Sequence, residues 1–298
     1  MALAALYDVP APAKLNLFLH VVGRRADGYH LIESVFVLID WCDVLHVERR
    51  ADGRLQRHDL EAPLPEDDLC LRAARSLQQA SGTRDGADIS IAKRVPWGAG
   101  MGGGSSDAAS TLLALNRLWR LRWPRERLEA LALTLGADVP FFVRGRNAFV
   151  SGIGEQILPI RVPGAWYAVV KPAAAIETKA IFGSSLLVRD TESVMISGSA
   201  AKQHAPFLEH CSAPGYGRND LQPPAAALVA DVGHAAALLD AHFGNSRMTG
   251  SGSAVFARAG GDTAQPGAAV PANLPPGWLG RMCRGLDAHP LVGWTEDR

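Results

Sequence analysis

Polar and apolar residues alternate along several stretches of the chain, as expected for strands that bury one face. The alternation is clearest from Lys14, where the segment KLNLFLHVV begins. Asp27 and Gly28 follow this stretch and are typical of a tight hairpin turn. Strands are predicted at 14–22, 31–39, 43–49, 88–95, 166–171 and 254–258, and a further strand region is predicted to open at Phe141, Phe142 and Val143.

Other stretches repeat apolar residues every three or four positions, which predicts helices with one buried face. Leu69, Ala73 and Leu77 follow this spacing, and Gly82 ends the segment. The predicted helices are 69–79, 105–119, 124–135 and 225–242. Because the strands come in runs and the helices are not interleaved with them one for one, the pattern favours an α+β fold over a doubly wound α/β sheet. The segment 190–217 is weakly patterned, and 260–276 is predicted to be a surface loop.

Composition narrows the class of protein. The 298 residues are 48% hydrophobic and 20% charged, with a formal net charge of zero, as in soluble globular proteins. A nucleic-acid-binding protein would be expected to carry a basic excess, so we expect no nucleic-acid partner. We also expect no membrane span, because no apolar run of about 18 residues occurs. Residues 1–12 lack the features of a signal peptide.

The four cysteines, Cys42, Cys70, Cys211 and Cys283, are widely spaced and lie near no histidine cluster. That spacing argues against a zinc site and against a disulfide framework. Reduced thiols in a cytoplasmic protein are therefore expected.

The most informative segment is the glycine-rich stretch PWGAGMGGGSSD at 96–107. Glycines let backbone N–H groups converge on an anion without clashes from Cβ atoms. Ser105 and Ser106 stand where the N-cap of the following helix is expected, and that helix would direct its positive end toward the same point. The segment is therefore predicted to bind phosphate.

Three other interpretations of this segment are weaker. A flexible linker need not lie between an alternating strand and an amphipathic helix. A P-loop requires a Lys that is missing here. Gly98, Gly100 and Gly103 match the dinucleotide-binding pattern G-x-G-x-x-G, which would suit an NAD(P)-dependent oxidoreductase. However, the preceding strand alternates and does not open a βαβ unit.

Two polar positions stand out elsewhere. Lys14 and Asn16 lie two residues apart on a predicted strand and therefore face the same side, which fits either a solvated face or the wall of a site. Asp138 is a lone carboxylate between a helix end and the apolar run that follows it. It could be a turn residue that bonds nearby backbone, or a functional acid.

Four segments together resemble the GHMP kinases. PWGAGMGGGSSDAA is similar to their second motif, APAKLNLFL with RADGYH resembles the first, and MTGSGSAVFA at 248–257 resembles the third. LGADVPFF resembles the segment that carries the catalytic Asp. The resemblance runs from about residue 12 to residue 256. It implies a two-domain α+β fold, with a ribosomal protein S5 domain 2-like domain at 1–160 and a ferredoxin-like domain at 161–298.

The resemblance also implies an activity. The triple-glycine form of the loop is similar to the branch of the family that uses ATP and Mg²⁺ to phosphorylate a cytidine diphosphate-linked polyol, in isoprenoid precursor biosynthesis. Asp138 would accept the proton of the substrate hydroxyl, assisted by Lys14. A homoserine or mevalonate kinase, or a non-catalytic nucleotide-binding protein on the same fold, is the alternative. The RADGYH segment favours the cytidine substrate, and the pairing of Lys14 with Asp138 favours catalysis.

The remaining site residues are implied by the same resemblance. Ser106 is also the candidate Mg²⁺ ligand. Two positions depart from the family pattern: Asp68 replaces an Asn linked to the nucleotide, and Lys179 replaces a Pro. Only small-molecule partners are expected, for a monomer or weak homodimer. The residues expected to bind ATP are Pro96, Trp97, Gly98, Ala99, Gly100, Met101, Gly102, Gly103, Gly104, Ser105 and Ser106, and those expected to bind the substrate are Asn16, Tyr29, His30, Thr178, Phe182, Thr249, Gly250 and Ser251.

Overall fold

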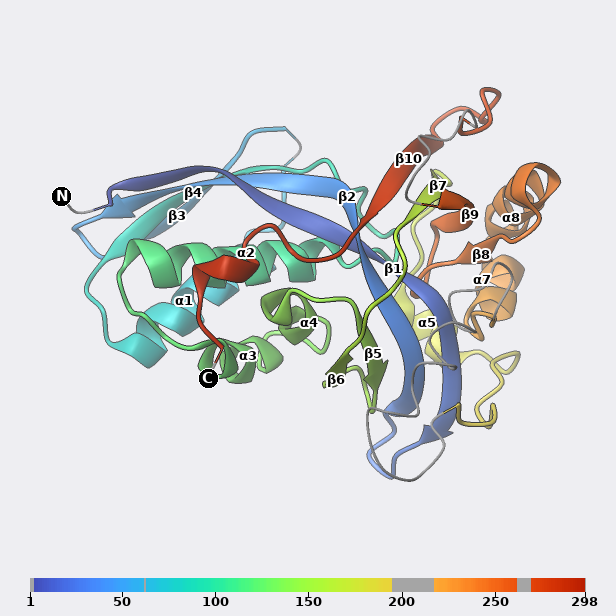
Figure 1. Cartoon of the computed structure of the whole chain (residues 1–298), viewed down its shortest axis with the longest axis horizontal. Coiled ribbons are helices and arrows are strands. Elements are labelled where there is room, and N and C mark those ends of the chain that lie inside the picture. The colour runs from blue at the N-terminus through green and yellow to red at the C-terminus, as the bar shows by residue number, and fades with distance from the viewer. Residues whose placement is uncertain (1–2, 62, 195–216, 262–268, 298) are drawn as a thin grey trace.

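A long antiparallel hairpin runs through the whole molecule (Figure 1). The structure is a computed structural model that describes residues 3–61, 63–194, 217–261 and 269–297. Strands β1 (Ala5–Arg24) and β2 (His30–Arg50) form the hairpin, and the predicted Asp27–Gly28 turn closes it. β1 changes register against β2 at four places, and such irregularities bend a strand pair.

The two strands predicted at 31–39 and 43–49 are one continuous strand. Residues 40–42, which separate the two predicted strands, belong to β2, where Cys42 pairs with Pro12 of β1. Asp43 continues this pairing opposite Ala11. Its carboxylate is fully buried and accepts hydrogen bonds from the backbone N–H groups of Arg94 and Val95 at 2.6 and 2.7 Å. A polar residue inside a buried strand is tolerated when its hydrogen bonds are made in this way.

The first half of the chain adds four short strands and four helices to the hairpin. The strands are β3 (Leu55–Asp59), β4 (Gly86–Ala92), β5 (Ala148–Ser151) and β6 (Gln156–Pro159), and the helices are α1 (Leu69–Ser81), α2 (Gly103–Leu118), α3 (Arg125–Leu133) and α4 (Val139–Arg144). The helices lie together on one face of the sheet (Figure 1). They bury an apolar core that includes Leu112, Leu115, Phe141 and Phe142.

Two further local predictions in this half were wrong. Phe141, Phe142 and Val143 belong to helix α4 and not to a strand. All three side chains are buried, so the run carries no periodicity by which a helix and a strand could be distinguished. The N-cap of α2 is Gly102, in the left-handed region, so Ser105 and Ser106 lie in the first turn and do not cap it.

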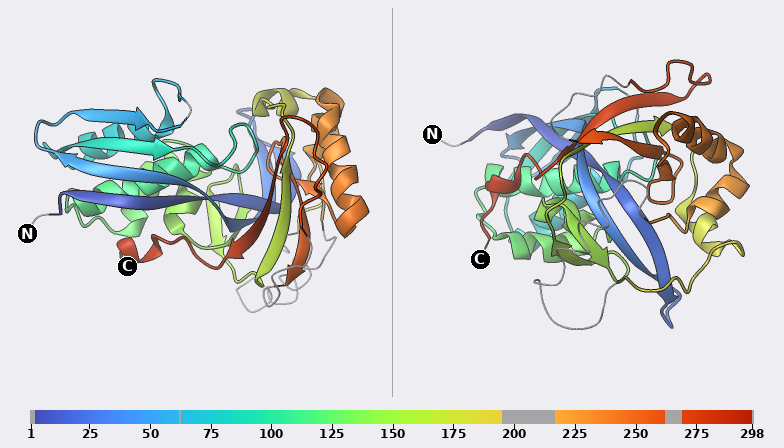
Figure 2. Two further views of the ribbon diagram at one scale, coloured as in Figure 1. Left: turned by 90° about the horizontal axis from the view of Figure 1, so that it is seen from above. Right: turned by 45° about the vertical axis from the view of Figure 1, so that its right-hand side comes forward.

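The second half forms a smaller sheet covered by helices on one side (Figure 2). Its strands are β7 (Ala165–Lys171), β8 (Arg247–Met248), β9 (Val255–Gly261) and β10 (Leu279–Leu286), and its helices are α5 (Thr178–Gly183), α7 (Gln222–Leu228) and α8 (Ala230–Phe243). The single helix predicted at 225–242 is therefore two helices, separated at Val229, whose backbone is extended. The segment 190–217 lies mostly outside the described residues, as does part of 260–276.

Strand β10 joins the two halves. It pairs with β7 along most of its length, and at its end Gly285 and Leu286 pair with Ile39 and Leu38 of β2. The chain then returns to the first half, where the short 3-10 helix η1 (Val292–Trp294) contacts α2. The expected division at residue 160 stays a prediction. None of the described helices has both the length and the apolar character to cross a membrane.

Candidate active site

A cleft of about 1120 Å³ opens between the two halves of the molecule. Its walls come from the glycine-rich loop, the β1–β2 hairpin, the start of α4, helix α5 and the turn after β8. Lys14, Asp138 and loop residues 96–105 line it, together with seven of the eight expected substrate-binding residues. Segments that are far apart in sequence thus converge on one space.

The glycine-rich loop is held by backbone hydrogen bonds. Met101 O accepts from Lys14 N at 3.0 Å, and Ala99 O accepts from Ala254 N at 3.2 Å. Gly100 has φ +72°, and a Cβ there would lie 2.2 Å from the Thr249 carbonyl oxygen. A side chain at this position would therefore separate the loop from the turn after β8. The loop ends at the N-terminus of α2, where unpaired N–H groups favour an anion.

Lys14 and Asp138 face each other beside this loop. Lys14 Nζ lies 3.6 Å from Asp138 Oδ2, and the ammonium also lies 4.5 Å from the centroid of the Phe36 ring. The Lys14 side chain is only 4% exposed, whereas that of Asp138 is 32% exposed. Burial lowers the pKa of Lys14, and the Asp138 carboxylate opposes that shift. The cleft thus presents a solvent-accessible carboxylate next to a sheltered cation.

Asn16 connects the hairpin to the turn after β8. Its Oδ1 accepts from Gly250 N at 2.9 Å and from Lys14 Nζ, and its Nδ2 donates to Ser34 Oγ at 2.9 Å. Thr249 Oγ1 accepts from Asn16 N at 3.0 Å. Thr249 is fully buried and lies behind the cleft wall, so in this structure it supports Asn16 from outside the cleft.

Aromatic residues gather at the far end of the cleft. The rings of His30 and Phe182 stack with centroids 4.8 Å apart and an interplanar angle of 24°. Tyr29 is 61% exposed on the same rim. Thr178 and Ser251, which both line the cleft, form a hydrogen bond to each other at 2.7 Å. A flat, aromatic-lined end of this kind suits a nucleobase.

Sequence reasoning missed Lys93. This lysine lines the cleft, and its ammonium contacts the buried carboxylates of Asp43 and Asp107. Burial lowers the pKa of Lys93, but Asp107 and Asp43 together raise it above its ordinary value. The chain has only five lysines beside 25 arginines, and Lys14, Lys93 and Lys179 all line the cleft. The scarcity of lysine was a signal that could have found it.

Asp68, which departs from the family pattern, has a structural role here. Its side chain accepts from Leu71 N at 3.1 Å as the N-cap of α1. Arg57 Nη1 lies 2.8 Å from the same carboxylate oxygen. Asp68 is not among the residues that line the cleft, although its neighbour Leu69 is.

The described residues contain no group of three or more His, Cys, Asp or Glu that could hold a metal ion. Ser106 lies just behind the loop, fully buried, and its Oγ has no hydrogen-bond partner in the described part of the chain. Its role as a metal ligand stays a prediction.

Comparison with known proteins assigns the family. Residues 68–146, which span α1 to α4 and include the glycine-rich loop, match the model of the GHMP kinases N-terminal domain. The 4-diphosphocytidyl-2-C-methyl-D-erythritol kinase of Methylibium petroleiphilum is 64% identical over 99% of this chain and 100% of its own length. That of Verminephrobacter eiseniae is 58% identical over 98% and 99%. The chain belongs to the 4-diphosphocytidyl-2-C-methyl-D-erythritol kinase family.

Solved structures agree with this assignment. A crystal structure of a 4-(cytidine 5'-diphospho)-2C-methyl-D-erythritol kinase superposes with a TM-score of 0.70 and 36% identity, covering 84% of this chain and 89% of the other. The homoserine kinase of Cytophaga hutchinsonii shares the fold, with a TM-score of 0.60 and 17% identity, covering 87% and 85%. The predicted α+β GHMP kinase fold is therefore confirmed for this member of the 4-diphosphocytidyl-2-C-methyl-D-erythritol kinase family.

Proposed function

We propose that the chain transfers the γ-phosphoryl group of ATP to the 2-hydroxyl of 4-diphosphocytidyl-2-C-methyl-D-erythritol, giving the 2-phosphate and ADP in isoprenoid precursor biosynthesis. The observation that carries the proposal is the position of the Lys14–Asp138 pair, beside the glycine-rich loop and in the same cleft as the aromatic end. One cleft thus contains an anion-binding loop, an aromatic end, one acid and one cation.

The phosphates of ATP bind along residues 96–106. The free N–H groups at the start of α2 and the glycine backbone receive them without any side chain in the way. Trp97, at the outer end of the loop, is 77% exposed on the rim of the cleft, where a bound nucleotide would cover its indole. The reacting end of ATP then lies at the inner end of the loop, next to Lys14.

The diphosphocytidyl end of the substrate binds where Tyr29, His30 and Phe182 gather. Stacking on aromatic side chains holds a base with about 1–3 kcal/mol per base. The polyol extends from there toward Asn16 and Asp138. Thr178, Gly250 and Ser251 line the path between the two ends.

Asp138 acts as the base. Its carboxylate accepts the proton of the 2-hydroxyl as the hydroxyl oxygen forms a bond to the γ-phosphorus and the bond to the β–γ bridging oxygen breaks. Lys14 carries no proton away. Its sheltered ammonium stabilises the negative charge on the transferring phosphoryl group, and its pairing with Asp138 orients the carboxylate.

Mg²⁺ would be held mainly by the nucleotide phosphates, as is usual for this ion. The unpartnered Ser106 Oγ behind the loop is the protein group that fits it. When bound, the ion neutralises phosphate charge. We further propose that the enzyme is cytoplasmic and is a monomer or weak homodimer. Its zero formal net charge supports the expectation that its partners are small molecules and not nucleic acids.

A coupled ADP-release assay with three acceptors tests this function. The cytidine diphosphate-linked methylerythritol, homoserine and mevalonate are offered in parallel with ATP. We expect turnover with the first alone. Turnover with homoserine or mevalonate alone would overturn the substrate assignment and leave the kinase assignment intact. Stabilisation against heat by NADH but not by ATP analogues would overturn both.

A further inference from the structure

Arg189 connects both aromatic groups at the base end of the cleft. Its Nε donates to His30 Nε2 at 3.1 Å, and its Nη2 donates to the carbonyl oxygens of Phe182 at 3.0 Å and Ser184 at 2.8 Å. Its Nη1 donates to Leu187 O at 2.9 Å. One guanidinium therefore determines where the His30 ring lies relative to the end of α5.

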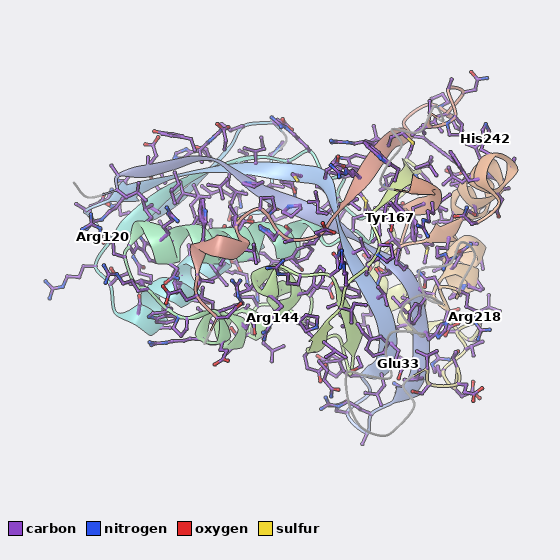
Figure 3. All side chains as sticks on the ribbon, viewed as in Figure 1. Glu33, Arg120, Arg144, Tyr167, Arg218 and His242 are labelled. Atoms are coloured by element: carbon purple, nitrogen blue, oxygen red, sulfur yellow. The ribbon has the colours of Figure 1, made fainter. Side chains whose placement is uncertain are left out.

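The segment that carries Arg189 is fixed to the hairpin. Val194 N donates to a carboxylate oxygen of Glu33 at 2.8 Å, and Thr191 N donates to Val21 O at 3.1 Å. Glu33 lies low on β2 in Figure 3, three residues beyond His30. Arg189 itself is not among the described residues that line the cleft, so it acts on a ligand through His30.

The hydrogen bond from Arg189 determines which nitrogen of His30 carries a proton. A guanidinium has donors only and no acceptor, so His30 Nε2 must be the acceptor. The proton of the neutral ring then lies on Nδ1, for which no hydrogen-bond partner exists among the described residues. Burial, Arg189 and Arg24 all lower the pKa of His30 and so favour the neutral ring.

We propose that Arg189 is a positioning residue that fixes the Nδ1–H tautomer of His30, so that this ring offers a hydrogen-bond donor to an acceptor edge of the substrate base. The inference rests on the proposed placement of the cytosine at this end of the cleft. Cytosine presents acceptors at O2 and N3, whereas N3 of uracil carries a proton. A fixed donor at His30 therefore favours a base edge rich in acceptors.

The tautomer itself can be measured without any substrate. In protein labelled with ¹⁵N-histidine, the two ring nitrogens of His30 are assigned by comparison with His30→Asn. At pH 7.5 we expect a protonated Nδ1 and an unprotonated Nε2 in the native chain, and a mixture of tautomers in Arg189→Met. A native chain with the proton on Nε2, or a variant with unchanged nitrogen shifts, would overturn the proposal.

Kinetics test the consequence for binding. Arg189→Met should raise the KM for the cytidine diphosphate-linked substrate about tenfold, which is the effect of one hydrogen bond. The KM for ATP and kcat should stay within about twofold. Arg218→Met is the matched control, because Arg218 (labelled in Figure 3) contacts Thr191 of the same segment and Asp220, and lies outside the cleft lining. It should change neither KM.

A double-mutant cycle separates positioning from general damage. If Arg189 acts through His30, Arg189→Met should add no further increase in KM to a His30→Ala background. Additive effects would show that Arg189 acts independently of His30 and would overturn the proposal. Absence of turnover by the native chain with this substrate would refute the proposed function alone, because the ¹⁵N measurement would still decide the tautomer.

Discussion

The imidazole of His289 should make the folded state sensitive to mild acid. It is 1% exposed, just after β10, where the chain returns to the first half of the molecule. Leu291 N donates to its Nδ1 at 3.1 Å, and its Nε2 lies 3.5 Å from Ser110 Oγ. Burial, with a smaller contribution from Arg125, lowers the pKa of His289 from 6.5 to about 3. The folded state therefore holds this ring neutral.

The size of the effect follows from linkage. The pKa is lower in the folded state than in the unfolded chain, so the unfolded chain binds more protons between pH 3 and 6.5. The contribution of neutral His289 to the stability of the folded state is complete above pH 6.5 and is lost as the pH falls toward 3. Because one pKa unit corresponds to about 1.36 kcal/mol, lowering the pH from 7 to 5 should remove about 2 kcal/mol.

Urea unfolding at pH 7, 6 and 5 measures this loss. His289→Asn is the informative variant, because an Asn oxygen can still accept from Leu291 N but does not titrate. The difference in unfolding free energy between the native chain and this variant should change by about 2 kcal/mol from pH 7 to pH 5. His234→Asn, which removes a mostly exposed histidine, is the control. The difference in unfolding free energy between the native chain and this variant should be nearly the same at pH 7 and pH 5. A constant difference for His289→Asn would refute the reasoning.

Three further predictions concern the loop, the base site and the C-terminal segment. Gly100→Ala should raise the KM for ATP at least about tenfold, since φ is +72° and the new Cβ would meet Thr249 O. Gly233→Ala in helix α8, whose Cβ would meet nothing within 4 Å, is the control in the same coupled assay. Phe182→Ala should raise the KM for the cytidine substrate about tenfold or more and spare that for ATP. Arg125→Met should lower the urea-unfolding free energy by about 3 kcal/mol, because the buried guanidinium donates to three backbone carbonyl groups.

Each of these predictions has an outcome that contradicts it. Equal KM values for ATP in Gly100→Ala and Gly233→Ala would show that the contact between the loop and the turn after β8 does not matter for nucleotide binding. A higher KM for ATP in Phe182→Ala would place this ring at the wrong end of the cleft. A loss below about 1 kcal/mol in Arg125→Met would mean that water replaces its hydrogen bonds.

The features predicted well from sequence are those encoded locally. The residues of the glycine-rich loop specify the conformation of its backbone, and so do those of the hairpin turn at Asp27–Gly28. The pairing of Lys14 with Asp138 required more than local pattern, because 124 positions separate them. The resemblance of their segments to family motifs supplied that expectation, and the structure brings the two side chains to 3.6 Å.

The features that were missed depend on tertiary contacts. Lys93 is held by Asp43 and Asp107 from two other segments, and no spacing along the chain reveals such a cluster. Arg189 has no local motif at all. The break at Val229 separates two Ala-rich helices, and one β-branched residue is too weak a signal to predict it.

The role of Asp138 is the central claim, and a single-turnover measurement on Asp138→Asn tests it most directly. Asn keeps the shape of the side chain but cannot accept the hydroxyl proton as a carboxylate does. We expect the rate of phosphoryl transfer to the cytidine substrate to fall by about 10²- to 10⁴-fold, while the Kd for ATP, measured by calorimetry on the same protein, changes less than about threefold. Transfer at a near-native rate would contradict the account, because the proton would then leave by a route that does not involve Asp138.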